Sequence, residues 1–231
     1  MKNGINKTIV EKVIKKIVFK IKPSSTFKTK KSKSRIPNLI NSLDANELSI
    51  NIGAGNTNYS SKIINLDIEK TNNVNVLADS RFLPIKSNSV SLVISQAVLE
   101  HTPETKRNID EIERVLKPKG ILYVEVPWMQ TFHAHPHDYF RFSHQGIESF
   151  LENFDIYEKG IAVGPASALA LNMRIFLATL FSFGNYKLFV FFGLIFSFLT
   201  FPIKFLDFFM ESNPLSFYSA SGIYVLAKKK T

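Results

Sequence analysis

The chain of 231 residues contains no cysteine. It therefore forms no disulfide and offers no thiolate to a metal ion, and its composition is compatible with a reducing cytoplasm. No uninterrupted apolar stretch follows the first lysines, so no signal peptide is predicted. With 45% hydrophobic residues, the chain is long enough to build one α/β domain with a full core.

Acidic residues are scarce at the N-terminal end, which accounts for the whole net charge of +10. Residues 1–35 carry 11 lysines and Arg35 against the single acidic residue Glu11, so the rest of the chain is close to neutral. Apolar residues within 9–21 recur at helical spacing, with lysines on the opposite face. This pattern favours an amphipathic helix on an anionic membrane surface; packing on the domain and nucleic-acid binding are the alternatives.

Two of only 10 glycines, Gly53 and Gly55, follow the short apolar run 48–52. This run can form a buried parallel strand, and a backbone without Cβ atoms can then turn sharply and approach a ligand closely. A second run, 63–67, ends in Asp67, whose carboxylate can accept hydrogen bonds from both hydroxyls of a ribose. The pattern indicates a nucleotide-type site at the ends of two neighbouring strands.

A dinucleotide-binding oxidoreductase is the main alternative for this pattern. Its third glycine would fall on Asn58, and Asp67 follows Gly55 by 12 residues, whereas that fingerprint places its acid about 20 residues on. Residues 56–62 are also too few and too polar for a long packed helix, so a helical turn or loop is expected there. The oxidoreductase is therefore disfavoured.

Strands and helices alternate in the rest of the chain. Further strands are predicted at 74–78, 90–95, 121–126, 155–163 and 222–228, with a helix at 106–116 that ends at 117–120. Such alternation predicts an α/β sheet whose ligand binds at the carboxyl ends of the strands.

In this order, the motifs resemble those of class I S-adenosylmethionine methyltransferases, and in particular the type 11 group. The likeness covers residues 49–154 and a final strand at 222–228, and the family's stretch RVLKPGG corresponds to Arg114-Val115-Leu116-Lys117-Pro118-Lys119-Gly120. The chain departs from the family at Asn51, where an acidic residue is usual, and at Lys119, which replaces the first glycine of a pair.

The resemblance implies a Rossmann-like seven-stranded sheet with its last strand antiparallel, and S-adenosyl-L-methionine as the cofactor. It implies a glycine loop beneath the methionine part, Asp67 at the ribose hydroxyls, Asp79 at the adenine amino group, and Ser95 and Gln96 beside the sulfonium. The full set of implied cofactor-binding residues is Asn51, Gly53, Ala54, Gly55, Asp67, Ile68, Asp79, Ser80, Ser95 and Gln96.

Four of the five histidines lie between His133 and His144, after the predicted fifth strand. The stretch resembles the signature HPxDYxRFS of relatives, which borders the acceptor pocket. The catalytic residues that this likeness implies are His137, Asp138, Tyr139 and Arg141. Among them, His137 is the candidate base, because imidazole titrates near neutrality, and Arg141 is expected to anchor an anionic or polar acceptor.

A metal site is the alternative function for the histidines. His133, His135 and His137 alternate as they would along one side of an extended strand, but no cysteine is present and carboxylate ligands would have to come from elsewhere. No metal is therefore predicted. His101, at the start of the helix after the fourth strand, is expected to bind backbone atoms.

Nucleic acid is a disfavoured acceptor, because no Asn-Pro-Pro-Tyr sequence, which clamps the exocyclic amines of bases, follows the fourth strand.

Residues 164–212 form a Phe-rich apolar insertion before the last strand. Neither of its two uncharged stretches reaches the roughly 20 residues of a membrane span, so a helical hairpin or interfacial helices, embedded but not crossing, are expected. A helical cap over the acceptor pocket is the alternative.

The expected organisation is a basic arm and linker at 1–36, with the polar linker at 23–34, a methyltransferase core at 37–163, the insertion at 164–212, and the final strand with a basic tail at 213–231. The expected function is methyl transfer to an oxygen of a glycan or lipid-linked intermediate, by a protein held peripherally or monotopically on the inner, cytoplasmic face of the membrane. A C-methyltransferase of an isoprenoid quinone and a catalytically silent membrane adaptor remain alternatives. The oligomeric state is not predicted.

Overall fold

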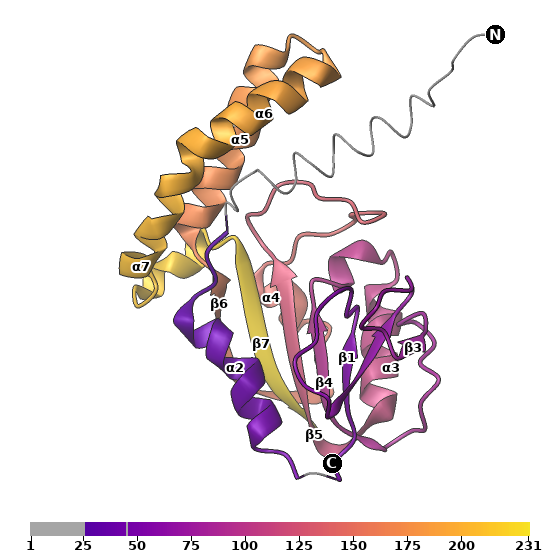
Figure 1. Cartoon of the computed structure of the whole chain (residues 1–231). Helices are drawn as coiled ribbons and strands as arrows, with labels where there is room; N and C mark the ends of the chain where they lie inside the picture. The colour runs from indigo at the N-terminus through magenta and orange to yellow at the C-terminus, as the bar shows by residue number, and fades with distance from the viewer. Residues whose placement is uncertain (1–25, 45) are drawn as a thin grey trace, which may run out of the picture.

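The computed structural model describes residues 26–44 and 46–231, which build one seven-stranded sheet in the order β3-β2-β1-β4-β5-β7-β6 (Figure 1). β1 to β5 are parallel to one another, and β7 runs antiparallel to both β5 and β6. The predicted Rossmann-like methyltransferase sheet with an antiparallel last strand is confirmed. The strands are β1 (Ser49–Ile52), β2 (Ile63–Asp67), β3 (Val76–Leu77), β4 (Val90–Gln96), β5 (Leu116–Pro127), β6 (Phe154–Val163) and β7 (Gly222–Lys229).

Helices cover both faces of the sheet, which is why its central strands β1 and β4 are buried along almost their whole length. On one face, α2 (Lys30–Asn41) packs Ile36 and Ile40 into a cluster with Tyr123 and Tyr224. On the other, α3 (Thr105–Val115) and α4 (His144–Glu148) close a second cluster. Because helices cover both faces of the sheet, a ligand can reach it at the carboxyl ends of the parallel strands.

Helix α2 begins inside the stretch expected to be a linker. Thr29 caps the helix by accepting the Ser32 backbone N–H, and its hydroxyl donates to the Ile161 carbonyl oxygen of β6 at 2.8 Å. Cap and sheet contact together fold the lysine-rich residues 30–34 into a helix rather than a linker. The amphipathic helix predicted within 9–21 lies outside the described residues.

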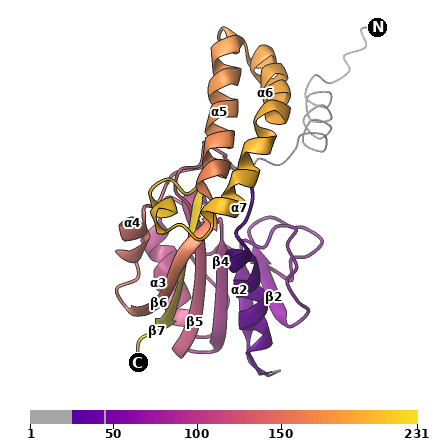
Figure 2. The same cartoon turned by 90° about the vertical axis from the view of Figure 1, so that its left-hand side faces the viewer.

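The insertion before β7 is helical, as predicted. Its first two helices, α5 (Pro165–Ser182) and α6 (Tyr186–Thr200), pack against each other as a hairpin that projects beyond the sheet (Figures 1 and 2). The chain continues through a 3-10 helix (Phe201–Leu206), α7 (Asp207–Met210) and a second 3-10 helix (Pro214–Tyr218) into β7. The hairpin thus leaves from β6 and returns to the neighbouring strand of the same sheet.

Asp207 ties the two ends of this hairpin together. Its side chain accepts the backbone N–H groups of Ala166 at 2.7 Å and Ser167 at 2.9 Å, and the residue is only 1% exposed. These N–H groups belong to the first turn of α5, where a negative charge also suits the helix dipole. The buried carboxylate therefore holds α7 against the start of α5 and closes the base of the hairpin.

Candidate active site

A cavity of about 470 Å³ lies at the carboxyl ends of β1, β2 and β3, where an open α/β sheet binds its ligands. Its wall combines the glycine loop after β1, the acidic end of β2, the segment after β3, the start of the segment after β4, and part of the loop after β5. The predicted cofactor residues on this wall are Gly53, Asp67, Ile68, Asp79 and Ser80, and the predicted catalytic residues on it are His137 and Tyr139.

Gly53 is required by the geometry of the turn after β1. Its φ is +64°, in the left-handed region, and a Cβ added there would lie 2.3 Å from Cγ2 of Val98. Gly55 also has a positive φ, +52°, but open space surrounds the position of its Cβ. The backbone of the turn therefore requires glycine at both positions, and close packing against Val98 requires it at Gly53 as well.

Asp67 links the glycine turn to the end of β2. Its Oδ2 atom accepts the backbone N–H of Gly55 at 2.7 Å, and its Oδ1 atom accepts that of Glu69 at 2.8 Å. The carboxylate is therefore oriented before any ligand arrives. It lies on the cavity wall with acceptor capacity left, as a residue that holds two ribose hydroxyls must.

Asp79 also lies on the cavity wall, but it is already paired. Arg81 donates its backbone N–H and its guanidinium to the Asp79 carboxylate and holds the pKa of that carboxyl below its usual range. The neighbouring Ser80 hydroxyl donates to the Asn108 side chain of α3. A contact between Asp79 and an adenine amino group therefore has to use a lone pair that Arg81 leaves free.

Three predicted cofactor residues in β1 and its turn do not reach the cavity. Asn51 is 2% exposed, and its Nδ2 atom donates to Oδ1 of Asn65 at 3.1 Å because these two residues are paired in the β1–β2 register. Ala54 is buried, and Gly55 turns its N–H to Asp67. The expected role of Asn51 in cofactor binding is thus not supported, since its side chain is hydrogen-bonded within the sheet.

Ser95 and Gln96 do not line the cavity either. Ser95 is completely buried between β1 and β5, and Gln96 donates from Nε2 to Oε2 of Glu125 at 2.8 Å while accepting from the Tyr59 hydroxyl. The chain turns at Ala97, whose φ is +54°, and the next residues take the place expected for Ser95 and Gln96. The residues of this segment on the wall are Val98, His101, Thr102 and Pro103.

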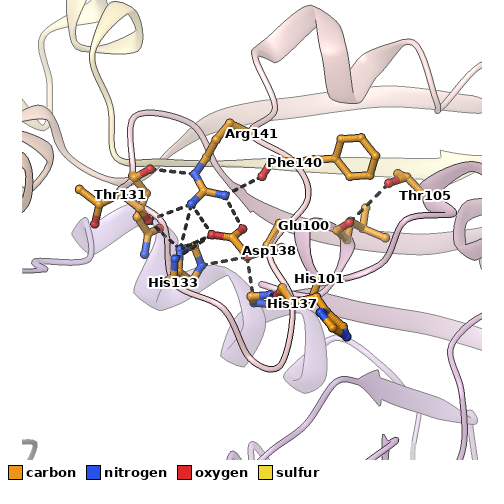
Figure 3. Close-up of polar contacts among 11 residues, drawn as sticks. Glu100, His101, Thr105, Thr131, His133, His137, Asp138, Phe140 and Arg141 are labelled. Carbon is orange, nitrogen blue, oxygen red and sulfur yellow. Dashed lines mark hydrogen bonds and ion pairs between the residues drawn. The ribbon is translucent and has the colours of Figure 1, made fainter. Parts of the chain in front are cut away.

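The loop after β5 is held by an ion pair between Asp138 and Arg141 (Figure 3). The guanidinium donates to both Asp138 oxygens, at 2.6 and 2.7 Å, and its other N–H groups reach the carbonyl oxygens of Gln130, Thr131 and Phe140. All five donors are thereby used. The expectation that Arg141 anchors an acceptor is not supported, because the residue fastens the loop instead.

Asp138 is the counterpart of this anchor. Its side chain is 1% exposed, and it also accepts the backbone N–H of His133 at 2.7 Å. The Arg141 guanidinium lowers the pKa of the Asp138 carboxyl to about 2, with a smaller contribution from the His133 N–H. A buried, permanently ionised carboxylate is suited to structure rather than to proton transfer.

His137 and Tyr139 keep the positions that a role in acceptor binding requires. Both lie on the cavity wall, and their rings are 5.6 Å apart. The Tyr139 backbone N–H donates to the carbonyl oxygen of Glu100 at 2.7 Å, which holds the loop against the segment after β4. His144, by contrast, packs against Phe217, with a distance of 4.2 Å between the ring centres, and is absent from the wall.

A cluster that the alternation of histidines did not predict lies beside the cavity. Of the three alternating histidines, His133 lies beside Glu100, whose Oε1 atom is 3.6 Å from its Nε2 atom, and His101 contributes the third side chain (Figure 3). His101 also binds the backbone, as expected, through the His137 carbonyl oxygen. The Glu100 carboxylate raises the pKa of His133. The available signal in the sequence was the pair Glu100-His101, an acidic residue and a histidine directly after the apolar residues Val98 and Leu99.

Comparison with known families agrees with the resemblance to methyltransferases found in the sequence. Residues 51–124 match the family Methyltransf_11, described as a methyltransferase domain. A 48-residue segment is 42% identical to the mitochondrial arginine-hydroxylase NDUFAF5 of mouse, and the human protein matches equally. That segment covers 21% of this chain but only 14% of the relatives, so their activity is not transferred to it.

Solved structures share the fold at low sequence identity. A Galdieria sulphuraria protein assigned as a sarcosine dimethylglycine methyltransferase is 12% identical with a TM-score of 0.55, over 92% of this chain and 96% of that one. Phosphoethanolamine N-methyltransferase 2 of Haemonchus contortus, in complex with S-adenosyl-L-methionine, is 15% identical with a TM-score of 0.53, over 87% and 52%. The chain thus spans about half of the second protein.

The family match, the strand order and the glycine–acid site together define a class I domain. Residues 51–124 match a methyltransferase domain, and the chain carries that segment on a Rossmann-like methyltransferase fold, whose cofactor is S-adenosyl-L-methionine. The bound cofactor supplies a methyl group already activated by its sulfonium. The residues that fit it are Gly53, which permits close approach, and Asp67, which is oriented towards the cavity. The protein then has to align an acceptor and, for a hydroxyl, remove its proton.

Proposed function

We propose that the protein methylates an oxygen of a glycan or lipid-linked intermediate at the cytoplasmic face of a membrane, with the hairpin of α5 and α6 embedded in the lipid. The observation that carries this proposal is the coupling of the hairpin to the loop after β5. Asn172 of α5 donates from Nδ2 to the carbonyl oxygen of Met129, at the start of that loop, at 3.0 Å. An acceptor held in lipid beside the hairpin would therefore lie next to the segment that carries His137 and Tyr139.

The hairpin exposes more apolar surface than a water-facing element does. Only 17% of the most apolar window in Tyr186–Met210 is buried within the structure. Large patches of this kind mark an interaction site, because a soluble protein rarely exposes contiguous apolar areas beyond a few hundred Å². The most exposed large side chains of the hairpin are Leu169, Phe176, Phe183, Tyr186, Phe191 and Leu199.

Lysines and aromatic rings meet at the base of the hairpin, which favours lipid over a protein partner. The Nζ atom of Lys204 lies 4.2 Å from the ring centre of Phe201, and that of Lys30 lies 4.7 Å from that of Phe208. Lysines that extend along aromatic rings are typical of the region where hydrocarbon meets headgroups. The base would then sit at the anionic surface, with the apolar helices beyond it.

A single membrane-spanning helix between β6 and β7 would place β7 on the opposite side of the membrane from the rest of its sheet. A hairpin of two helices avoids this separation. Both Pro165–Ser182 and Tyr186–Met210 are long and apolar enough to cross a membrane, by length and composition. At 1.5 Å per residue, an 18-residue helix is about 27 Å long, close to the hydrocarbon thickness of about 30 Å. Because the two helices return the chain to one sheet, insertion to any depth leaves the domain on one side.

Flotation with anionic liposomes tests the membrane part of the proposal. We expect the full chain to float, and Phe191→Lys combined with Leu199→Lys to reduce flotation to the level that the basic arm of residues 1–35 supports alone, because each buried charge is costly in hydrocarbon. Leu77→Lys, a 63% exposed position in β3 at the opposite edge of the sheet, is the matched control and should float normally. Equal flotation of the hairpin variant and the control would contradict the embedded hairpin.

The acceptor is tested with S-adenosylmethionine carrying a deuterated methyl group, incubated with the protein and membrane extracts. We expect the label on an oxygen of a glycan or lipid-linked product, identified by mass spectrometry after hydrolysis. Label on a ring carbon of an isoprenoid quinone would favour that alternative. Cofactor binding without any labelled product would favour a silent adaptor.

A further inference from the structure

Three hydrogen-bond acceptors converge beside the cofactor cavity, from Glu100, His101 and His133 (Figure 3). The Oε1 atom of Glu100 lies 3.6 Å from Nε2 of His133 and 3.8 Å from Nε2 of His101. Glu100 is 0% exposed, and within residues 26–44 and 46–231 neither of its carboxylate oxygens has a hydrogen-bond partner. A buried carboxylate without donors is costly, so its surroundings call for a positive charge.

The ring orientation of His101 is set by the backbone. Its Nδ1 atom lies 2.6 Å from the carbonyl oxygen of His137, which can only accept, so Nδ1 carries the hydrogen. In the neutral ring, Nε2 is then a lone pair, and it is this atom that faces Glu100. A histidine whose Nδ1–H is bound by a carbonyl group is the usual arrangement of a metal ligand.

The same conclusion holds for His133, by counting hydrogens. Its Nδ1 atom lies 2.9 Å from the Thr131 carbonyl oxygen and 3.2 Å from NH2 of Arg141. NH2 has two hydrogens, and both are given to closer partners, the Thr131 carbonyl at 2.8 Å and Asp138 at 2.7 Å. Nδ1 must therefore donate to Thr131, which leaves the Nε2 lone pair facing Glu100.

We propose that Glu100, His101 and His133 form a binding site for a divalent first-row transition-metal ion such as Zn²⁺. Two imidazole Nε2 atoms and one carboxylate are a ligand set that such ions prefer. With metal–ligand distances of about 2.1 Å, tetrahedral ligands lie about 3.4 Å apart. The two Glu100–histidine distances, 3.6 and 3.8 Å, already approach that value, and all three ligand atoms lie within 4.8 Å of one another.

The ion would have an open position towards the cofactor. Of the three ligands, His101 lies on the cavity wall, so the fourth coordination position faces the space beside the cofactor. A metal ion there would bind an acceptor oxygen and lower the pKa of its hydroxyl, which takes over part of the work of a base. This last step rests on the proposed function, whereas the metal site does not.

Binding of Co²⁺ and Zn²⁺ to the untagged full-length protein tests the site without any acceptor. We expect one Co²⁺ per chain, with the visible absorption of nitrogen and oxygen ligands, displaced by Zn²⁺. Glu100→Gln and His133→Asn should each weaken binding more than about tenfold, since loss of even an outer partner of a ligand costs that much. The neighbouring His135→Gln, outside the ligand set, should keep the stoichiometry and affinity of the unaltered chain.

S-adenosylhomocysteine binding checks that each variant is folded. If Glu100→Gln does not fold, His133→Asn carries the test, because its side chain is 30% exposed and its loss disturbs the core less. Two results would refute the site. One is that the unaltered chain binds no stoichiometric metal, in which case a proton rather than a metal ion would neutralise Glu100. The other is that a folded ligand variant binds Co²⁺ as tightly as His135→Gln. Metal binding without methyl transfer would leave the site intact and contradict only the proposed function.

Discussion

Asp67 at the end of β2 accepts the backbone N–H of Gly55, from the turn after β1, at 2.7 Å. One side chain thus holds the glycine turn and presents an oriented carboxylate to the cavity, where we expect the ribose of the cofactor. The two strand ends are paired in register, Ile52 beside Leu66, so the contact follows from the parallel sheet. The cofactor site is therefore largely formed before the cofactor binds.

Replacing Gly53 by alanine should damage this site. The new Cβ would lie 2.3 Å from Cγ2 of Val98, and the residue would keep a φ of +64°. We expect stability to fall by about 1–3 kcal/mol, as for an overpacked core, together with weaker S-adenosylhomocysteine binding. Adding Val98→Ala should restore part of both by relieving the contact, as measured by urea unfolding and calorimetry. No loss in Gly53→Ala would contradict the described turn.

Removing the Arg141 side chain should affect stability first. Arg141→Ala leaves Asp138, whose side chain is 1% exposed, without its ion-pair partner. Breaking a buried pair in this way costs about 3–5 kcal/mol, which urea unfolding measures. The double variant Asp138→Ala, Arg141→Ala should lose less than the sum of the single losses. A stable Arg141→Ala protein would instead restore the expectation that this residue waits for an acceptor.

The Asp138 carboxyl should make stability depend on pH in the acid range. Arg141 lowers its folded-state pKa to about 2, below the value of about 3.9 expected in the unfolded chain. A lowered pKa stabilises the fold above the unfolded value, and the contribution is lost as the pH falls towards 2. Between pH 5 and pH 3 the loss is about 1 kcal/mol. Asp138→Asn should remove this part of the slope in urea unfolding, whereas the exposed Asp155→Asn should keep it.

The absence of native cysteine allows a labelling test of the hairpin. Phe183, 85% exposed at the hairpin tip, can be replaced as Phe183→Cys, and Tyr218, 80% exposed near β7, as Tyr218→Cys. We expect anionic liposomes to slow labelling by a water-soluble maleimide severalfold at the tip and to leave position 218 unchanged. If liposomes left the labelling rate at position 183 unchanged, as at position 218, the hairpin tip would stay in water.

The elements with strong local patterns could be predicted from the sequence. The run 63–67 coincides with β2, and the helix expected at 106–116 is Thr105–Val115, because apolar spacing alone defines such segments. The glycine turn and the Asp67 strand end also meet as expected, since parallel neighbours bring their carboxyl ends to one edge.

What could not be predicted depends on contacts between distant segments. The side chain of Asn51 hydrogen-bonds to Asn65, its partner in the strand register, and that of Gln96 hydrogen-bonds to Glu125 of the neighbouring strand. The cluster of Glu100 and His133 joins residues 33 positions apart through a folded loop, for which no periodicity exists. Residue type and spacing identify the segment that carries a site, while the direction of each side chain requires the structure.

The most direct test of the cofactor site is calorimetric titration with S-adenosylhomocysteine, comparing the unaltered chain with Asp67→Ala and Asp67→Asn. We predict one site per chain and a loss of about 10- to 100-fold in affinity for Asp67→Ala, because it removes hydrogen bonds from a charged acceptor worth about 1.5–3 kcal/mol. Asp67→Asn should fall between the two. If folded Asp67→Ala bound S-adenosylhomocysteine as tightly as the unaltered chain, the cofactor would not lie in the cavity at the ends of β1 and β2.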